Sequence, residues 1–394
     1  MAKAPTRKDT CSDRVPAGDC SWIERGSVME TRFDDKDHAQ KAGAASGGPA
    51  LKGFDRAFYL KTLKELIDVD STTGQYLEMQ DHIRGFLDGL GIRHSEIRKG
   101  GVIAETGSGG EPLCITAHLD DIGLMVRHVN DDGTLNVCPV GGLYPFYCVT
   151  ENVRIYSRGG RVTTGSICRI PNSVHVTEEE LRGELPDYRK NVCVIIDEDV
   201  KCAADTKALG IDTGDFIAPE PRFTVAGDYI KSRFLDDKAS AAILMLLLRE
   251  ISAGRLSVSR KIYWYFAFYE EIGHGTVCLP PDVKDILAVD IAPVGPDQNS
   301  SEQKVSIFAM DSRFPYHKGF TEELREIAAA SGIDYVMDVF TPHYGTDCDP
   351  AVAAGYDLRH AAIGPGTLNS HGYERMHVRG IENTYGLLEA VIGI

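Results

Sequence analysis

The sequence predicts a three-layer α/β/α fold that carries an inserted β-rich module. Strand-length apolar segments alternate with segments of helical periodicity over much of residues 54–394, as is typical of a sheet covered by helices on both faces. Between residues 129 and 225 the pattern changes to short alternating stretches separated by glycine-rich turns. This module separates two parts that share the chemistry-bearing residues, so we interpret it as an insertion.

The helices and strands of the main domain follow from hydrophobic periodicity. In residues 55–69, for example, Phe58, Leu63 and Ile67 fall on one helical face. The predicted helices span residues 55–69, 75–89, 239–251, 321–330, 346–354 and 381–392. The predicted strands span residues 102–105, 113–117, 262–269, 286–292, 304–309, 334–340 and 358–363. They define a main domain of residues 54–128 and 226–394, interrupted by the β-rich domain of residues 129–225.

The N-terminal segment and the overall charge narrow the class of protein. Residues 1–53 have mixed charge, many small residues and little apolar periodicity, which predicts a disordered extension. The net charge of −16 disfavours nucleic acid and anionic membrane as partners. No apolar run approaches the about 20 residues that a membrane-spanning helix needs. The basic N-terminus also lacks the apolar core of a signal peptide.

The cysteines indicate a reducing environment. They form no Cys-x-x-Cys pair and no tight cluster, which in a chain of 394 residues favours reduced thiols of a cytoplasmic protein over a disulfide framework. A secreted, bridged protein is the minority interpretation. The cysteines are Cys11, Cys20, Cys114, Cys138, Cys148, Cys168, Cys193, Cys202, Cys278 and Cys348.

Five segments place a histidine or an acidic residue close to the ends of predicted buried strands. Open α/β sheets build their sites at such strand ends, so these side chains are expected to converge. Each one alone also allows a structural explanation, such as a satisfied loop histidine or a carboxylate that caps the following helix. The five residues are His118, Asp236, Glu271, Asp290 and His371.

The pair Glu270-Glu271 is the most informative of these features. It directly follows the apolar and aromatic run of residues 262–269. Two adjacent carboxylates at the end of a buried strand repel each other, and the arrangement makes sense if one binds a cation and the other carries a proton. The alternative is a solvated strand end.

Taken together, the five residues predict a metal site. Two histidines and three carboxylates, without cysteine, form a nitrogen and oxygen ligand set that suits zinc, cobalt or manganese. A carboxylate shared between two ions, with two further ligands for each, is what a two-metal hydrolytic site requires. Glu270 remains as a general base, and Asp120 can support the imidazole of His118.

Several segments, in order, resemble metallopeptidase family 42. This family comprises the glutamyl and tetrahedral (TET) aminopeptidases, and some members are described as endoglucanases. The resemblance runs from about residue 54 to residue 394. The segments are AHLDDIGLMV, KALGIDTGDFIAP, RFLDDKAS, FYEEIGHG, AVDIAP and SHGYE.

The resemblance implies a zinc-aminopeptidase-like catalytic domain with an inserted, β-barrel-like domain. By this resemblance, His118 and Asp290 hold one divalent ion, Glu271 and His371 hold the other, and Asp236 bridges them. The ions would be zinc, with cobalt and manganese as alternatives. The enzyme would remove N-terminal residues from short peptides, with Glu270 as the base and Asp120 as a supporting residue.

The resemblance also implies a function for the inserted domain, and this chain differs from the family pattern at a few positions. The inserted domain would serve dimerisation and substrate access in a homo-oligomer, built from dimers and reaching a dodecamer in the family. The family usually has Glu where this chain has Asp121. His274 and residues 343–350 also differ from the family's sequence pattern, and they are expected to line the substrate pocket.

Three alternatives stay open at this point. The same site could act on another small amide, as a dipeptidase or a deacylase. A glycosidase is disfavoured, because glycosidases work through paired carboxylic acids and need no zinc-type ligands. A non-catalytic binding or scaffold protein is disfavoured by the complete set of ligands and base.

Overall fold

The computed structural model describes residues 53–393. The predicted extension of residues 1–53 lies outside the described residues except for Gly53, as do Cys11 and Cys20. The other cysteines are free thiols. Between residues 53 and 393, no helix has both the length and the apolar character needed to span a membrane.

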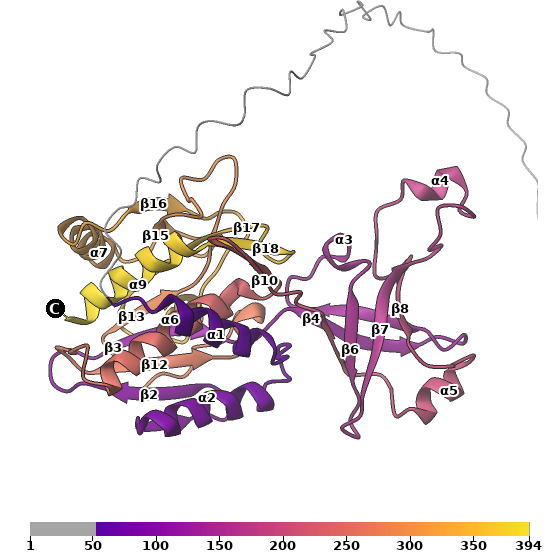
Figure 1. The fold of residues 1–394 in the computed structure, drawn as a ribbon, viewed down its shortest axis with the longest axis horizontal. Helices are drawn as coiled ribbons and strands as arrows, with labels where there is room; N and C mark the ends of the chain where they lie inside the picture. Colours follow the sequence, from indigo (N-terminus) through magenta and orange to yellow (C-terminus); the bar gives the residue numbers. More distant parts are fainter. Residues whose placement is uncertain (1–52, 394) are drawn as a thin grey trace, which may run out of the picture. The chain divides into compact units, whose positions relative to one another are not determined.

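The described chain combines helices with a large mixed sheet and a closed barrel (Figure 1). The helices are α1 (Arg56–Ile67), α2 (Leu77–Leu90), α3 (Pro145–Cys148), α4 (Glu179–Arg182), α5 (Ala203–Ala208), α6 (Leu235–Ser252), α7 (Lys318–Ala330), α8 (Cys348–Ala353) and α9 (Val378–Gly393), with a 3-10 helix at Glu270–Ile272. The strands are β1 (His94–Glu96), β2 (Val102–Thr106), β3 (Leu113–His118), β4 (Gly123–Val129), β5 (Leu135–Val140), β6 (Asn152–Tyr156), β7 (Val162–Arg169), β8 (Val192–Ile196), β9 (Phe216–Pro219), β10 (Thr224–Ala226), β11 (Tyr229–Ser232), β12 (Ile262–Ala267), β13 (Asp285–Val289), β14 (Ala292–Pro293), β15 (Val305–Met310), β16 (Tyr335–Val339), β17 (Arg359–Leu368) and β18 (Glu374–His377).

The centre of the main sheet is parallel. Its strand order is β1-β2-β12-β3-β13-β17, and β17 continues through β18 and β11 to β10. β12, β3, β13 and β17 run parallel to one another, whereas β2 and β15 pair antiparallel with β12 and β17, respectively. The carboxyl ends of four adjacent strands therefore meet at one edge of the sheet.

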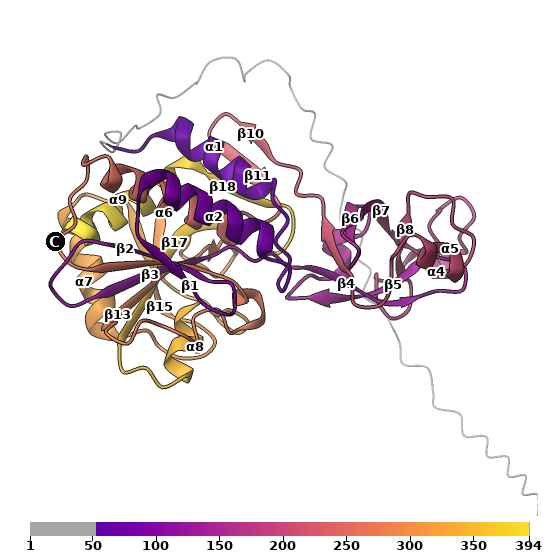
Figure 2. The ribbon, with the colours of Figure 1, turned by 90° about the horizontal axis from the view of Figure 1, so that it is seen from below.

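Both faces of this sheet are covered. Every residue of β3 is buried, and successive side chains enter two different core clusters: Leu113 and Ile115 lie in one, and Cys114 in the other. Helices α1, α2, α6 and α9 pack on the first face, and α8 packs on the second (Figure 2). A strand buried on both sides is expected to be a continuous apolar run. The three-layer α/β fold predicted from the sequence is confirmed.

The β-rich module is a closed barrel with the strand order β4-β5-β8-β7-β6-β9. Its interior is filled by alternating apolar side chains such as Val153, Ile155 and Ile217, all of which are buried. The first barrel strand begins at Gly123 and the last ends at Pro219. Strands β10 and β11 then return to the main sheet through β18. The inserted barrel predicted from the sequence is thus present.

One predicted strand is longer than the sequence indicated. The predicted strand of residues 358–363 ends too early, so this boundary is wrong. Strand β17 continues to Leu368, because β15, β14 and β18 supply hydrogen-bonding partners along its second half. Partner strands from distant parts of the chain leave no local signal in the sequence.

Candidate active site

Three of the candidate residues come from the carboxyl ends of neighbouring strands. His118 is the last residue of β3, Asp290 directly follows β13, and Glu271 lies in the 3-10 helix after β12. Because β3 pairs in parallel with both β12 and β13, these three chain segments emerge side by side. This is the position at which open α/β sheets place their sites.

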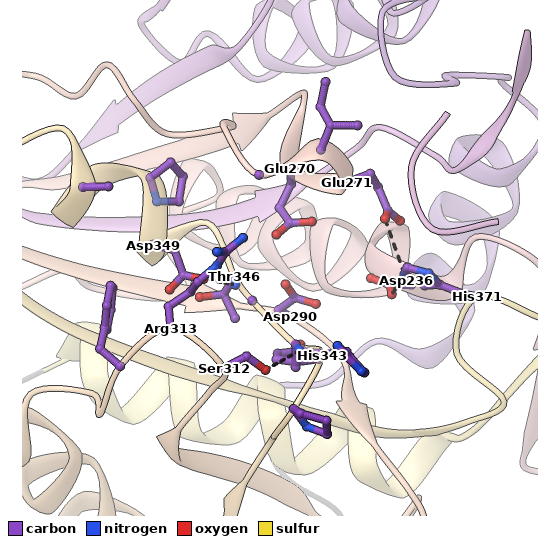
Figure 3. Close-up of a pocket in the computed structure, with 18 residues that line it drawn as sticks. Asp236, Glu270, Glu271, Asp290, Ser312, Arg313, His343, Thr346, Asp349 and His371 are labelled. Carbon is purple, nitrogen blue, oxygen red and sulfur yellow. Dashed lines mark hydrogen bonds and ion pairs between the residues drawn. The ribbon is translucent and has the colours of Figure 1, made fainter. Parts of the chain in front are cut away.

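Asp236 and His371 complete the cluster from other elements. Asp236 lies at the start of α6, and His371 lies in the loop between β17 and β18. Asp236 Oδ1 is 3.2 Å from His118 Nε2, and Asp236 Oδ2 is 3.5 Å from His371 Nε2. Glu271 Oε2 is 3.4 Å from the same His371 nitrogen (Figure 3). Asp236 thus presents one carboxylate oxygen to each imidazole.

The structure adds Asp237 to the predicted residues. Potential ligand atoms of His118, Asp236 and Glu271 lie within 4.8 Å of one another, and so do those of His118, Asp237 and Asp290. Asp237 is not one of the five ligands predicted from the sequence. In the structure its Oδ2 accepts a hydrogen bond from the backbone N–H of His118, and its buried Oδ1 has no hydrogen-bonding partner.

Asp120 organises both His118 and the glutamate pair. Its backbone carbonyl lies 3.1 Å from His118 Nδ1, and its Oδ1 lies 3.6 Å from the same atom. Its carboxylate also accepts the backbone N–H groups of Glu270 and Glu271 and the hydroxyl of Thr73. With Nδ1 facing these acceptors, Nε2 is the ring nitrogen directed towards Asp236 and available as a ligand.

Glu270 points into the same pocket as the candidate ligands (Figure 3). Its Oε2 lies 3.7 Å from His118 Nε2, and its side chain is 14% exposed. Burial raises the pKa of Glu270 well above its usual range, and the nearby Asp290 carboxylate raises it further, although His118 acts in the opposite direction. A carboxyl group in this environment is suited to accepting and returning a proton.

The electrostatics of the cluster fit bound cations. Burial raises the pKa of Asp290, and it raises that of Glu271 to about 8. Asp236 behaves differently: burial opposes its ionisation, but hydrogen bonds from His118 and His371 lower its pKa. Buried carboxylates that crowd one another are stabilised by a metal cation. Since the donors are imidazole nitrogens and carboxylate oxygens, the residues present fit zinc, cobalt or manganese.

Sequence reasoning assigned no function to Glu374, although the structure places it in the site. Its Oε2 accepts the backbone N–H of Asp236 at 3.1 Å, and its Oε1 accepts that of His371 at 3.0 Å. Burial raises its pKa to about 8. The carboxylate therefore joins the two segments that carry these candidate ligands. The available signal was an acidic residue at the start of a short strand, which is weak on its own.

Asp121, the departure noted beside His118, forms a buried ion pair. Lys238 Nζ lies 2.6 Å from Asp121 Oδ2, and the two side chains are 0% and 2% exposed. Lys238 also donates to the backbone carbonyl of Val69. Burial raises the pKa of Asp121 to about 6, against the influence of Lys238. The pair joins the loop after His118 to the beginning of α6.

A cavity of about 850 Å³ opens from the cluster. Its lining residues are Asp236, Glu270, Glu271, Ile272, Gly273, Asp290, Ser312, Arg313, Phe314, Pro342, His343, Tyr344, Gly345, Thr346, Asp349, Pro350, Ala353 and His371. Most of the segment 343–350 lines the cavity, as expected. His274 does not: its ring stacks on Tyr269 with the centroids 5.1 Å apart, and it contacts Lys99.

Gly364 is packed so closely that its replacement by alanine should disrupt the site. A Cβ atom there would lie 1.4 Å from the backbone oxygen of Asp290, so the backbone of Asp290 would have to move. We expect Gly364→Ala to lower the free energy of unfolding by about 3 kcal/mol. Urea denaturation of the metal-free protein measures this change.

Gly85→Ala is the matched control for that substitution. Gly85 lies in α2, and no atom comes within 4 Å of the position of an added Cβ. This change should stabilise the protein by about 0.5–1 kcal/mol, because alanine loses less conformational entropy in a helix. Equal stability of Gly364→Ala and the wild type would contradict the close approach to Asp290.

Comparisons with known proteins identify the family. The family model for M42 glutamyl aminopeptidase matches residues 100–387. A curated relative from Bacillus subtilis (strain 168), named "Putative aminopeptidase YhfE", is 35% identical over 334 residues, which cover 84% of this chain and 95% of the relative.

Solved structures agree on the fold. The TET aminopeptidase from the marine sediment archaeon Thaumarchaeota archaeon SCGC AB-539-E09 superposes with a TM-score of 0.77 at 17% identity, covering 85% of this chain and 96% of the other. The TET1 peptidase of Pyrococcus horikoshii superposes with a TM-score of 0.74 at 21% identity, covering 85% and 99%. The resemblance seen in the sequence is confirmed: the chain belongs to the M42 glutamyl aminopeptidase family, whose members are metal-dependent hydrolases of peptide bonds.

Proposed function

We propose that this protein removes N-terminal residues from peptides by means of two divalent metal ions bound in one site. The observation that carries the proposal is the Asp236 carboxylate, whose two oxygens face the Nε2 atoms of His118 and His371 at 3.2 and 3.5 Å. A carboxylate placed in this way can be shared between two ions, as a two-metal hydrolase requires.

The remaining ligands divide between the two ions. His118 and Asp290 would hold one ion, Glu271 and His371 would hold the other, and Asp236 would contact both. Zinc is the first choice, with cobalt or manganese as alternatives. When bound, such ions lower the pKa of the attacking water and stabilise negative charge on the carbonyl oxygen of the substrate.

The protein's own groups then transfer the proton. Glu270 takes a proton from the water whose oxygen attacks the scissile carbonyl carbon. When the carbon–nitrogen bond breaks, Glu270 returns this proton to the leaving amine. Asp120 keeps Glu270 in place by accepting its backbone N–H at 3.1 Å. The acidic cluster also suits the positively charged α-amino group of a peptide, which would restrict the enzyme to N-terminal residues.

We propose in addition that the domain of residues 129–225 serves dimerisation and substrate access in a homo-oligomer. Val174, Val176 and Leu185 expose large apolar side chains on this domain. Exposed apolar residues of this kind favour contact with another protein surface. The Pyrococcus horikoshii TET1 peptidase can assemble into a tetrahedron or a large octahedral shell. The domain division at residues 128 and 226 and the cytoplasmic location remain predictions.

A substrate panel tests the proposed function. Purified protein loaded with zinc, cobalt or manganese should hydrolyse aminoacyl amides with a free α-amino group. The corresponding N-acylated amino acids and amides should not react, because they lack the charged amine that the acidic cluster would bind. Release of the leaving group is followed by absorbance, and unblocked dipeptides in the same panel identify a restriction to dipeptides.

Metal removal is the control in this panel. EDTA should abolish hydrolysis, and an excess of one of the three metals should restore it. If N-acylated substrates are hydrolysed faster than those with a free α-amino group, the activity is that of a deacylase rather than an aminopeptidase. Activity that persists after complete removal of metal would contradict the two-metal proposal.

A further inference from the structure

The loop that carries His371 has a backbone conformation that needs external support. His371 and Asn369 have φ angles of 61° and 60°, in the left-handed region that residues other than glycine rarely occupy. Residues are held there only where surrounding contacts fix them. One contact is the hydrogen bond from the His371 N–H to Glu374. A second is the approach of His371 Nδ1 to the backbone oxygen of Gly142, at 3.2 Å.

Arg233 makes a third contact to this loop. Its guanidinium donates to the backbone carbonyl of Gly372, the residue after His371, at 3.2 Å. It also donates to the backbone carbonyl of Tyr147 and to Glu151 Oε1, the latter at 3.0 Å. The Arg233 side chain is 2% exposed. One buried cation therefore joins three segments of the chain.

Glu151 supplies the negative charge that Arg233 needs. Its side chain is 9% exposed, and its own backbone carbonyl accepts the N–H of Ile167 in barrel strand β7. Arg222 also donates to Glu151 Oε1, at 2.7 Å, but its side chain is 45% exposed. A buried arginine without its carboxylate partner would strongly destabilise the folded protein, because its charge would be uncompensated. The position of Arg233 therefore depends on the barrel.

We propose that Arg233 is a positioning residue for His371, held in place by Glu151 of the barrel. Arg233 lies three residues before Asp236, so it connects the segment of the shared ligand to the loop of the second histidine. The planar guanidinium is suited to this task, because its fork of donors reaches several acceptors at fixed angles. The inference rests on the proposed two-metal function and concerns the ion held by Glu271 and His371.

The test is a titration of the metal-free, full-length protein with Co²⁺, followed by visible absorption. The wild type should take up two equivalents. Arg233→Lys keeps the charge but loses the fork, so one equivalent should bind as in the wild type and the other about 10–100-fold more weakly. The spectrum at one equivalent should match that of His371→Ala. Activity of Arg233→Lys should recover at high Co²⁺ concentration, which general structural damage would not allow.

Arg154→Lys is the matched control. Arg154 also joins the barrel to the main domain, through a bidentate ion pair with the buried Asp70, but it does not contact the His371 loop. This variant should bind both equivalents as the wild type does. Glu151→Gln is the alternative variant if Arg233→Lys fails to fold, because glutamine has the same shape as glutamate. It should show the same selective weakening of binding of one Co²⁺ equivalent.

The outcomes separate the two proposals. A wild-type protein that binds fewer than two equivalents contradicts the two-metal function, and this inference with it. A wild-type protein that binds two equivalents contradicts the inference alone if the Arg233 and Glu151 variants bind both normally. The inference is likewise overturned if these variants weaken both equivalents equally, or if Arg154→Lys shows the same loss.

Discussion

Replacing Glu270 by glutamine should lower kcat by about 10³-fold without loss of bound metal. Glutamine has the size of glutamate but cannot accept the proton of the attacking water. The side chain is not one of the proposed ligands, and its Oε2 lies 3.7 Å from His118 Nε2. The backbone N–H of residue 270 would still donate to Asp120, so the loop should keep its position. The measurement pairs kcat on an aminoacyl amide with elemental analysis of bound metal.

Glu271→Gln provides the comparison that gives this result its meaning. Both glutamates lie in one 3-10 helix, and both donate a backbone N–H to Asp120. Glu271→Gln should instead weaken binding of the ion that Glu271 and His371 would hold together. His371 Nε2 lies 3.4 Å from Glu271 Oε2. A near-normal kcat in Glu270→Gln would show that Glu270 is not the general base. Loss of metal from Glu270→Gln would show that Glu270 is a metal ligand.

The parts of the fold that the sequence predicts well are those governed by local pattern. Strand β3 is buried at every position and mostly apolar, because both sheet faces are covered, and such a run can be recognised from the sequence. His118 and Asp290 stand out because burying a polar or charged side chain at the end of such a run is costly unless it is paired or binds a metal. Strand ends in a parallel sheet converge, so their proximity could be predicted without knowledge of the side-chain packing.

The contacts that hold the site together could not be predicted in the same way. Glu374 bonds to Asp236 across 138 positions in the chain, and Arg233 bonds to Glu151 across 82. Such pairs have no periodicity, and each partner alone resembles an ordinary surface residue. His274 shows the opposite error: an unusual residue beside the glutamate pair suggested a pocket position, but its ring stacks on Tyr269 outside the cavity lining.

Replacing Asp236 by asparagine should remove both metal ions under conditions in which the wild type keeps them. An amide offers one neutral oxygen, and its NH₂ group would face either His118 or His371, where the carboxylate now presents an oxygen at 3.2 or 3.5 Å. The loss of metal assistance corresponds to several kcal/mol of transition-state stabilisation, or about 10³-fold or more in kcat. Elemental analysis after dialysis, with kcat on the same aminoacyl amide, checks both expectations.

Asp290→Asn distinguishes a shared ligand from a ligand of one ion. Asp290 belongs to the group that contains His118 and Asp237, whereas Asp236 lies against both histidines. If Asp236 is shared, its asparagine variant loses two ions and Asp290→Asn loses one. Equal loss of a single ion in both variants would assign Asp236 to one metal only. The unsatisfied Oδ1 of Asp237 would then be the strongest remaining candidate for the shared position, because it is buried beside the same histidine.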